Sequence, residues 1–214
     1  TVEDPVEATI RGINQVQVNT KAGMTFPNAL RAFLRQDPDI IMVGEIRDGE
    51  TAEIAIRAAI TGHLVLSTLH TNDSISSINR LIDMGIEPFL IASSLVGVVA
   101  QRLVRRLCPH CKEEYAATER EVKILKSAKD ISLFKPVGCP ACNGTGYKGR
   151  IAVYEILTIT DELKELISAN ATVGRMKEVA LKNGMKTLAA NCSRLVTSGI
   201  TSLEEMLSVV AVRE

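Results

Sequence analysis

Apolar runs alternate with amphipathic stretches along the first hundred residues. Uninterrupted apolar runs occur in DIIMVGEI (residues 39–46) and HLVLSTL (residues 63–69), as in strands buried on both faces of a parallel sheet. Two shorter β-prone stretches, TVEDPV and NQVQVN, lie at residues 1–6 and 14–19. The pattern therefore predicts four strands in this part of the chain.

Helices are predicted between and after these strands. Apolar residues repeat at helical spacing after Thr25, and an alanine-rich stretch ends at Gly62, a typical C-cap. Asp73 is a typical N-cap, and Pro88 marks the start of another helix. The predicted helices cover residues 25–36, 50–61, 73–84 and 88 to about 107. This alternation indicates an α/β domain with a parallel sheet and helices on its faces, residues 1–107.

The remainder of the chain has a different pattern. Residues 108–150 contain two Cys-x-x-Cys pairs, a charged helix between them and the glycine-rich stretch GCPACNGTGYKGR. The strand RIAVYEILTI follows, and the last predicted helices lie near residues 161–170, 172–183, 187–199 and 202–209. The pattern therefore adds two parts to the α/β domain, a cysteine-rich element at residues 108–150 and a small helical subdomain at residues 151–214.

Composition and charge exclude two broad classes of protein. The chain has 214 residues, is 46% hydrophobic, and carries 25 basic and 25 acidic side chains, for a net charge of +0. This balance gives no reason to expect binding to nucleic acid or to an anionic membrane. We expect the local basic cluster of Arg102, Arg105 and Arg106 to be a helix face. No apolar run reaches the ~20 residues that cross a bilayer, so no transmembrane segment is expected.

Four of the five cysteines form the pairs Cys108-Pro-His-Cys111 and Cys139-Pro-Ala-Cys142. No signal peptide opens the chain, which favours a reducing compartment and a metal site over disulfides. Two such pairs can close a tetrahedral site, which is structural rather than catalytic. We therefore predict bound Zn²⁺; a redox-active Cys-x-x-Cys is the alternative.

Acidic side chains follow predicted strands at two places. Glu45 comes at the end of a run of four apolar residues, the position where α/β folds bind ligands. Glu3, Asp4 and Glu7 cluster at the end of the first strand, and clustered carboxylates repel one another unless a cation or basic groups neutralise them. Mg²⁺, which prefers oxygen ligands, would serve. The alternatives are a solvated strand end and an acidic turn.

Basic and imidazole side chains lie close to these acids in the sequence. Arg31 and Arg35 are four residues apart on one helix face, and Arg47 follows Glu45 closely; such arginines suit phosphate recognition or are solvated helix charges. His63 and His70 bracket the second apolar strand. A neutral histidine there can donate a hydrogen bond to a phosphate, or it can simply be a satisfied polar residue at a strand end.

Four segments occur in a characteristic order: TVEDPVE, LRAFLRQDPDIIMVGEIRD, TGHLVLSTLHTN and CPHC…CPAC. In this combination the chain closely resembles, over essentially its whole length, the C-terminal part of the type II secretion and type IV pilus assembly ATPases. The resemblance implies an α/β fold with a truncated RecA-like parallel sheet. It also implies ATP hydrolysis, with ATP and Mg²⁺ as cofactors beside Zn²⁺.

The resemblance further implies a setting for the whole protein. A homo-hexamer in the cytoplasm, peripheral at the inner face of the cell membrane, would power assembly of pilin-like subunits. Its partners would be the inner-membrane platform proteins of a secretion or pilus machine.

The resemblance also implies roles for individual residues. Glu45 would be the catalytic glutamate that activates water, and Glu3, Asp4 and Glu7 would lie near Mg²⁺ and the nucleotide. His63 and His70 would connect the nucleotide site to the moving parts of the ring. Because the intervening strand has odd length, we expect one ring at the phosphate side and the other at the domain interface. Four arginines match positions near the nucleotide or the subunit boundary: Arg31, Arg35, Arg47 and Arg150.

One motif of the family does not occur in this sequence. The phosphate cradle G-x-x-x-x-G-K-[ST] is absent from residues 1–214. Since that loop holds the β- and γ-phosphates and Mg²⁺, we expect it upstream of Thr1. The chain as given would then be a fragment that binds ATP poorly or not at all and does not hydrolyse it.

Two other readings remain open from the sequence. One is a zinc-ribbon-like module that binds protein or nucleic acid; however, only Cys139–Cys142 fits the glycine-rich repeat of chaperone zinc domains, and 3% aromatic residues do not suit base stacking. The other is a retraction-type motor, against which the four paired cysteines argue, because the retraction ATPases lack this element.

Overall fold

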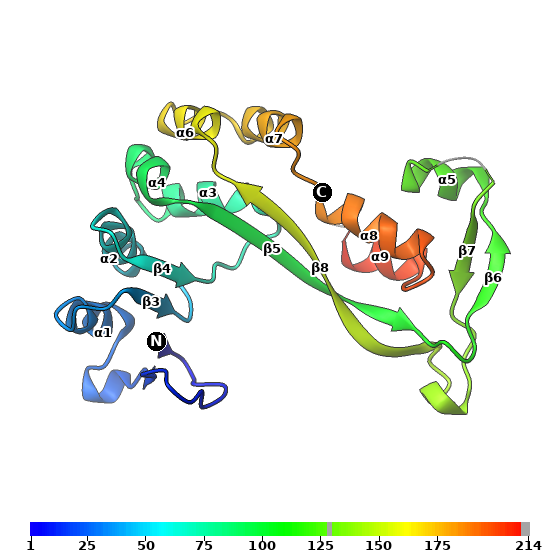
Figure 1. The fold of residues 1–214 in the computed structure, drawn as a ribbon, viewed down its shortest axis with the longest axis horizontal. Coiled ribbons are helices and arrows are strands. Elements are labelled where there is room, and N and C mark those ends of the chain that lie inside the picture. Colours follow the sequence, from blue (N-terminus) through cyan, green and yellow to red (C-terminus); the bar gives the residue numbers. More distant parts are fainter. Residues whose placement is uncertain (128–129, 211–214) are drawn as a thin grey trace. The chain divides into compact units, whose positions relative to one another are not determined.

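The computed structural model describes residues 1–127 and 130–210 (Figure 1). The chain divides into two compact units. Unit 1 comprises residues 1–98 and 157–183, and unit 2 comprises residues 99–156 and 184–214. The limits of these units do not coincide with the predicted boundaries at residues 107 and 150.

Unit 1 is built on a parallel sheet of four strands in the order β2-β1-β3-β4. The strands are β1 (Val2–Glu3), β2 (Val16–Gln17), β3 (Ile40–Val43) and β4 (Leu64–Ser67). Val2 pairs with Val43, which in turn pairs with Ser67. The carboxyl ends of β1, β3 and β4 therefore lie in one row, and the predicted parallel α/β sheet is confirmed.

Helices of unit 1 follow the predicted amphipathic stretches. Thr25 and Asp48 cap the first two by accepting a backbone N–H with their side-chain oxygens. The helices are α1 (Phe26–Phe33), α2 (Gly49–Ile60), α3 (Ser76–Asp83), α4 (Pro88–Ser94), α6 (Asp161–Ser168) and α7 (Val173–Lys182), with a short 3₁₀ turn η1 (Thr20–Ala22). Helix α2 packs against α1, α4 and β4, and α4 packs against α6.

Strand β4 is less buried than its apolar sequence predicts. It forms the edge of the described sheet, and Leu64 and Leu66 are 51% and 49% exposed. Ile40 of the neighbouring strand is also exposed. We predicted a strand that is covered on both faces. Within residues 1–127 and 130–210, no other element covers the side chains of Leu64, Leu66 and Ile40, so this prediction is not confirmed for the described part of the chain.

The predicted long helix from Pro88 to Leu107 is wrong. Helix α4 ends at Ser94, and residues 97–107 form strand β5 (Gly97–Leu107). Beyond Gly97 burial alternates, with Ala100 and Val104 buried and the residues between them more exposed, the period of a strand. Three β-branched valines at 96, 98 and 99 further favour extended backbone. This strand carries the chain out of unit 1, which explains the different domain boundary.

Unit 2 contains the cysteine-rich element and the last two helices. Its elements are β6 (Glu113–Ala116), α5 (Glu119–Leu125), β7 (Ser132–Lys135), the 3₁₀ turn η2 (Pro140–Cys142), α8 (Leu188–Thr197) and α9 (Leu203–Val209), together with β8 (Tyr147–Thr158), which pairs with β5. Strands β6 and β7 form an antiparallel pair around α5. The core includes Val104, Leu133, Val153, Cys192 and Val196.

The predicted C-terminal helices are confirmed, but the structure does not group them into one subdomain. Helices α6 and α7 belong to unit 1, whereas α8 and α9 belong to unit 2. Among the described residues, no helix has the length and apolar character to cross a bilayer.

An ion pair between a buried carboxylate and a half-exposed guanidinium joins α9 to β5 in unit 2. The Glu205 carboxylate, whose side chain is 5% exposed, accepts hydrogen bonds from the Arg105 backbone N–H (2.9 Å), Nε (2.8 Å) and Nη2 (2.6 Å). The Arg105 guanidinium also lies 4.0 Å from the centre of the Tyr147 ring. Arg105 therefore has a structural partner, and the basic cluster lies on a strand rather than on the expected helix face.

Candidate functional site

Glu45 lies at the carboxyl edge of the unit 1 sheet. It follows β3 directly and is buried, with 11% of its side chain exposed. Glu3 ends β1 on one side, and Thr68 follows β4 on the other. A Cβ at Gly44 would lie 3.2 Å from the Val2 carbonyl oxygen and 3.3 Å from Glu3 Cα, so glycine lets the two strand ends approach closely.

Two basic side chains contact the Glu45 carboxylate. Arg47 Nε donates a hydrogen bond to Oε2, and His70 Nε2 lies 3.2 Å from the same oxygen. The hydrogen bond from Arg47 is the main reason that the pKa of Glu45 is lowered, against the opposing effect of burial; His70 lowers it further. Glu45 is therefore an ionised carboxylate near neutral pH. A carboxylate at this position can polarise a water molecule, and its two neighbours can contact an anion.

The acidic segment lies beside this site. Oε1 of Glu3 accepts hydrogen bonds from the Thr1 hydroxyl (2.5 Å) and from Gln15 Nε2 (3.1 Å), and these bonds lower the pKa of Glu3. Asp4 is close enough to Arg47 for its charge to raise the pKa of that guanidinium, after the larger contribution of Glu45. Asp4 also lines a polar hollow of about 390 Å³ beside β2. Glu7 is exposed and contributes a backbone hydrogen bond to Glu3.

The two candidate histidines lie at opposite ends of strand β4. His70 follows the carboxyl end of β4 and contacts Glu45, with its side chain 83% exposed. His63 precedes the amino end of β4, where its Nδ1 lies 3.0 Å from the Ala58 carbonyl oxygen and 3.2 Å from Thr61 Oγ1. The structure thus brings His70 and Glu45 together and places His63 at the end of α2, away from the acidic residues.

The four candidate arginines are separated from one another. Only Arg47 contacts Glu45. Arg31 on α1 pairs with Glu50 of α2 at 2.6 Å, and both side chains are more than half exposed. Arg35 is exposed just beyond the end of α1, and Arg150 is exposed on β8 of unit 2.

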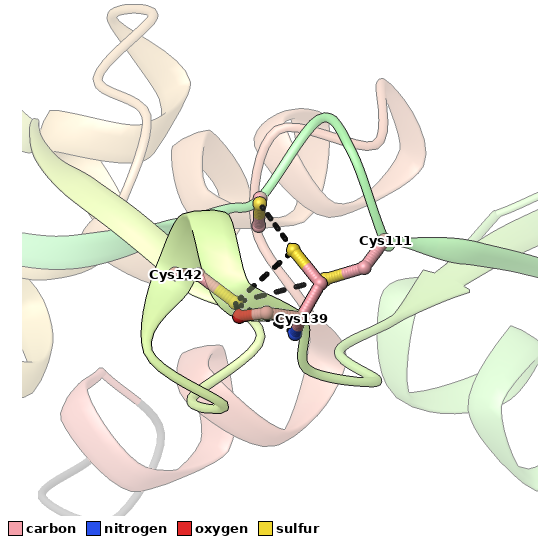
Figure 2. Close-up of side chains that lie close together, drawn as sticks. Cys111, Cys139 and Cys142 are labelled. Carbon is pink, nitrogen blue, oxygen red and sulfur yellow. Dashed lines mark hydrogen bonds between the residues drawn. The ribbon is translucent and has the colours of Figure 1, made fainter.

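The paired cysteines form a second site, in unit 2. The sulfur atoms of Cys108, Cys111, Cys139 and Cys142 all lie within 4.8 Å of one another, and Figure 2 shows the latter three converging. The Sγ–Sγ distances are 3.9 Å for Cys108–Cys139, 3.8 Å for Cys111–Cys142 and 3.7 Å for Cys139–Cys142. A tetrahedral zinc ion with bonds of about 2.3 Å separates its sulfurs by about 3.8 Å. The cluster is therefore compatible with zinc, and its sulfurs are too far apart for disulfides.

Backbone N–H groups donate hydrogen bonds to two sulfur atoms of this cluster. The N–H groups of Cys139 and Gly146 donate to Cys142 Sγ, each at 3.2 Å, and Gly138 N–H donates to Cys111 Sγ at 3.3 Å. Although burial opposes ionisation, these bonds lower the pKa of Cys142 to about 6. Burial raises the pKa of the Cys111 thiol to about 11. A bound cation would favour the thiolate form of all four sulfurs.

Two glycines beside the cysteine cluster were not predicted from the sequence as residues of that site. Gly138 and Gly146 have positive φ and flank the second cysteine pair; a Cβ at Gly138 would lie 2.5 Å from the Gly144 carbonyl oxygen. The available signal was a glycine directly before the second Cys-x-x-Cys pair and another four residues after it. The hydrogen-bond partners of Thr68 at the sheet edge could not be predicted, because they depend on strand register.

Comparisons with known proteins identify the family to which the chain is similar. A family model described as "Type II/IV secretion system protein" matches residues 1–208. The type IV pilus assembly ATPase PilB of Thermus thermophilus is 54% identical over 97% of this chain and 24% of its own length. The type II secretion system ATPase E of Vibrio cholerae is 53% identical over 98% of this chain and 42% of its own. The chain thus spans less than half the length of these curated relatives.

Solved structures of other proteins are similar in fold to this chain. The pilus retraction motor PilT with bound ADP superposes with a TM-score of 0.70 at 29% identity, covering 97% of this chain and 50% of that one. The ATPase DotB of Legionella pneumophila superposes with a TM-score of 0.66 at 20% identity, covering 95% of this chain and 48% of that one, a similarity of fold alone. Because the family model covers almost the entire sequence, the chain belongs to the type II/IV secretion system protein family.

Proposed function

We propose that residues 1–214 supply the water-activating part of an ATPase site in a motor for protein secretion or pilus assembly. The observation that carries the proposal is the Glu45 carboxylate, buried at the carboxyl edge of the sheet and held by Arg47 and His70. An ionised glutamate at this position can take a proton from, or orient, the water that attacks a γ-phosphate. The names of the relatives, ATPases of type II secretion and type IV pilus assembly, support this reaction.

The remaining groups at the edge have roles that follow from their positions. Arg47 and His70 would contact the phosphates, because each already lies against the carboxylate that must face the attacking water. Glu3 and Asp4 would orient the water shell of Mg²⁺. Glu7, which donates a backbone hydrogen bond to Glu3, would support them near the ion. His63, at the other edge of the sheet, would serve the domain interface instead.

Binding of ATP needs a phosphate cradle that residues 1–214 do not contain. The relatives are more than twice as long as the matched region. The cradle would therefore lie in the part of such a protein that the match does not cover. Arg31, Arg35 and Arg150, which are exposed and separate from Glu45, would act at contacts between subunits.

The four cysteines would hold a structural Zn²⁺. The sulfur spacing fits a tetrahedral ion, and the closed set of four ligands leaves no position for a substrate. The predicted link between this element and assembly motors, rather than retraction motors, favours an assembly role. The whole protein would act as a homo-hexamer at the inner face of the cell membrane, with platform proteins of the secretion or pilus machine as partners.

Glu45→Gln tests the proposal in the longer protein that carries this chain. Loss of a general base lowers turnover by a factor of about 10² to 10⁴, so kcat for ATP hydrolysis should fall at least a hundredfold while ATP affinity changes little. Glu53→Gln, which removes an exposed acid paired with Arg57 on α2, is the matched control and should leave kcat unchanged. Wild-type turnover by the Glu45→Gln variant would refute the assignment.

A second experiment tests whether this chain can hydrolyse ATP without the phosphate cradle. Residues 1–214 by themselves should hydrolyse ATP no faster than buffer. Robust turnover by this polypeptide would show that it holds a complete site and would overturn the proposed division of the site.

A further inference from the structure

The ladder between β3 and β4 slips by one residue at Glu45. Val43 pairs with Ser67, so a regular parallel ladder would next bring the N–H of Glu45 to the carbonyl of Thr68. Instead the N–H of Ile46 donates to that carbonyl, at 3.0 Å. Gly44 and Glu45 together thus occupy the place of one residue, which is the arrangement of a β-bulge.

Thr68 is bonded to both peptide groups that flank Glu45. Its carbonyl accepts from Ile46 N–H, which belongs to the peptide after Glu45, and its hydroxyl donates to the Gly44 carbonyl, in the peptide before Glu45, at 2.7 Å. On the opposite side, Gly44 N–H donates to the Val2 carbonyl at 2.8 Å. The backbone on either side of Glu45 is therefore fixed from two neighbouring strands.

A bulge changes the direction in which a side chain leaves a strand. Without the extra residue, the ladder would continue through Glu45, and alternation would set the direction of its carboxylate. The hydroxyl of Thr68 gives the Gly44 carbonyl a hydrogen-bond partner, which the backbone ladder between β3 and β4 does not supply. Valine has nearly the same shape but cannot donate this bond, whereas serine can.

We propose that Thr68 is a positioning residue for Glu45, holding both flanking peptides so that the carboxylate points to the attacking water. The inference rests on the proposed function for its catalytic part, whereas the hold on the backbone is independent of it. Thr68 touches the main chain around Glu45 and is assigned no contact with substrate. A misplacement of a catalytic group by about 1 Å lowers turnover by as much as a hundredfold.

Amide hydrogen exchange in the 214-residue chain tests the hold on the backbone. Loss of one neutral hydrogen bond corresponds to a factor of about five, so Thr68→Val should speed exchange about fivefold at the Ile46 amide, whose N–H is bonded to the Thr68 carbonyl. Thr68→Ser should stay within about twofold of the wild type. Thr197→Val is the matched control, because it removes an exposed threonine hydroxyl that donates to a backbone carbonyl in α8 of unit 2, and it should leave exchange at Ile46 unchanged. Unchanged exchange at Ile41 and Val43 shows that the variants are folded.

Steady-state kinetics of the longer protein test the positioning role. Thr68→Val should lower kcat about tenfold with KM for ATP within about twofold, and Thr68→Ser should restore most of the loss. Faster exchange with normal kcat in Thr68→Val would overturn the positioning role alone. Unchanged exchange, or a serine variant as impaired as valine, would overturn the inference about the hydroxyl. Full turnover by Glu45→Gln would instead overturn the proposed function.

Discussion

Replacing Glu205 by glutamine removes the negative charge from the buried end of the ion pair in unit 2. The carboxylate accepts three hydrogen bonds from Arg105, one of them from the backbone N–H. A hydrogen bond to a charged group contributes about 1.5–3 kcal/mol to stability, and a neutral one about 0.5–1.5 kcal/mol. Because the Arg105 side chain is 52% exposed, water screens part of the interaction. The net loss in the free energy of unfolding of unit 2 should be about 2 kcal/mol.

The neighbouring residue provides a matched control. Glu204 and Glu205 both lie in the first turn of α9, but Glu204 is exposed. Each acid interacts favourably with the helix dipole by about 0.3–1 kcal/mol. The difference between Glu205→Gln and Glu204→Gln therefore reports the hydrogen-bonded pairing with Arg105, on which Glu204 acts only through its charge.

Tyrosine fluorescence is a selective assay for this unit. The chain has no tryptophan and three tyrosines, Tyr115, Tyr147 and Tyr154, and all three belong to unit 2. Urea titration followed by this signal reports the unfolding of unit 2 without a contribution from unit 1. A difference between the two variants below about 0.5 kcal/mol, the range of ordinary surface substitutions, would refute the reasoning.

The same pair predicts a dependence of stability on pH. Burial alone would raise the pKa of Glu205, but the hydrogen bonds and charge of Arg105 more than compensate, so the pKa is lowered from its usual 4.5. A lowered carboxyl pKa in the folded state stabilises the fold above the unfolded value, and the stabilisation is lost as pH falls through the folded value. The advantage of wild type over Glu205→Gln should be constant above pH 4.5 and shrink below it. An advantage that persists unchanged at pH 3 would contradict this assignment.

Two further predictions concern the two sites. Purified chain should contain about one zinc ion by plasma mass spectrometry, because four thiolates close one tetrahedral site. Cys139→Ser should abolish that zinc and lower the urea midpoint of unit 2, whereas Cys192→Ala, which removes the buried cysteine outside the cluster, should retain it; zinc in the Cys139→Ser variant would refute the site. Arg47→Ala should raise the pKa of Glu45 towards its usual 4.5, since Arg47 is the main cause of its lowered value, and carbon-13 NMR titration of the carboxyl would measure this. No change in that pKa would show that Arg47 does not hold Glu45.

Elements with strong local signals were predictable from the sequence. The helices that begin after Thr25, Thr160 and Thr187 are each capped by that residue, and caps are readable in a single sequence. The cysteine cluster was predictable because two pairs with metal-ligand spacing have few other uses. The placement of Glu45 at a sheet edge followed from the apolar run before it.

Features that depend on distant contacts were not predictable. The sequence after Ser94 is apolar enough for a helix; its valines favour a strand, but pairing with the distant β8 decides that it is extended. The slip at Glu45 depends on hydrogen bonds of Ile46 and Thr68, 22 positions apart in the numbering. Which of the two histidines lies beside Glu45 was likewise not predictable, because it depends on the direction of β4 in the sheet.

The open edge of β4 has a consequence for handling the protein. An unpaired strand edge with half-exposed leucines is a template for strands of other molecules, which is a common start of aggregation. Leu64 and Leu66 are of this kind in the part of the chain that the structure describes. We therefore expect residues 1–214 to self-associate through this edge at the concentrations needed for NMR.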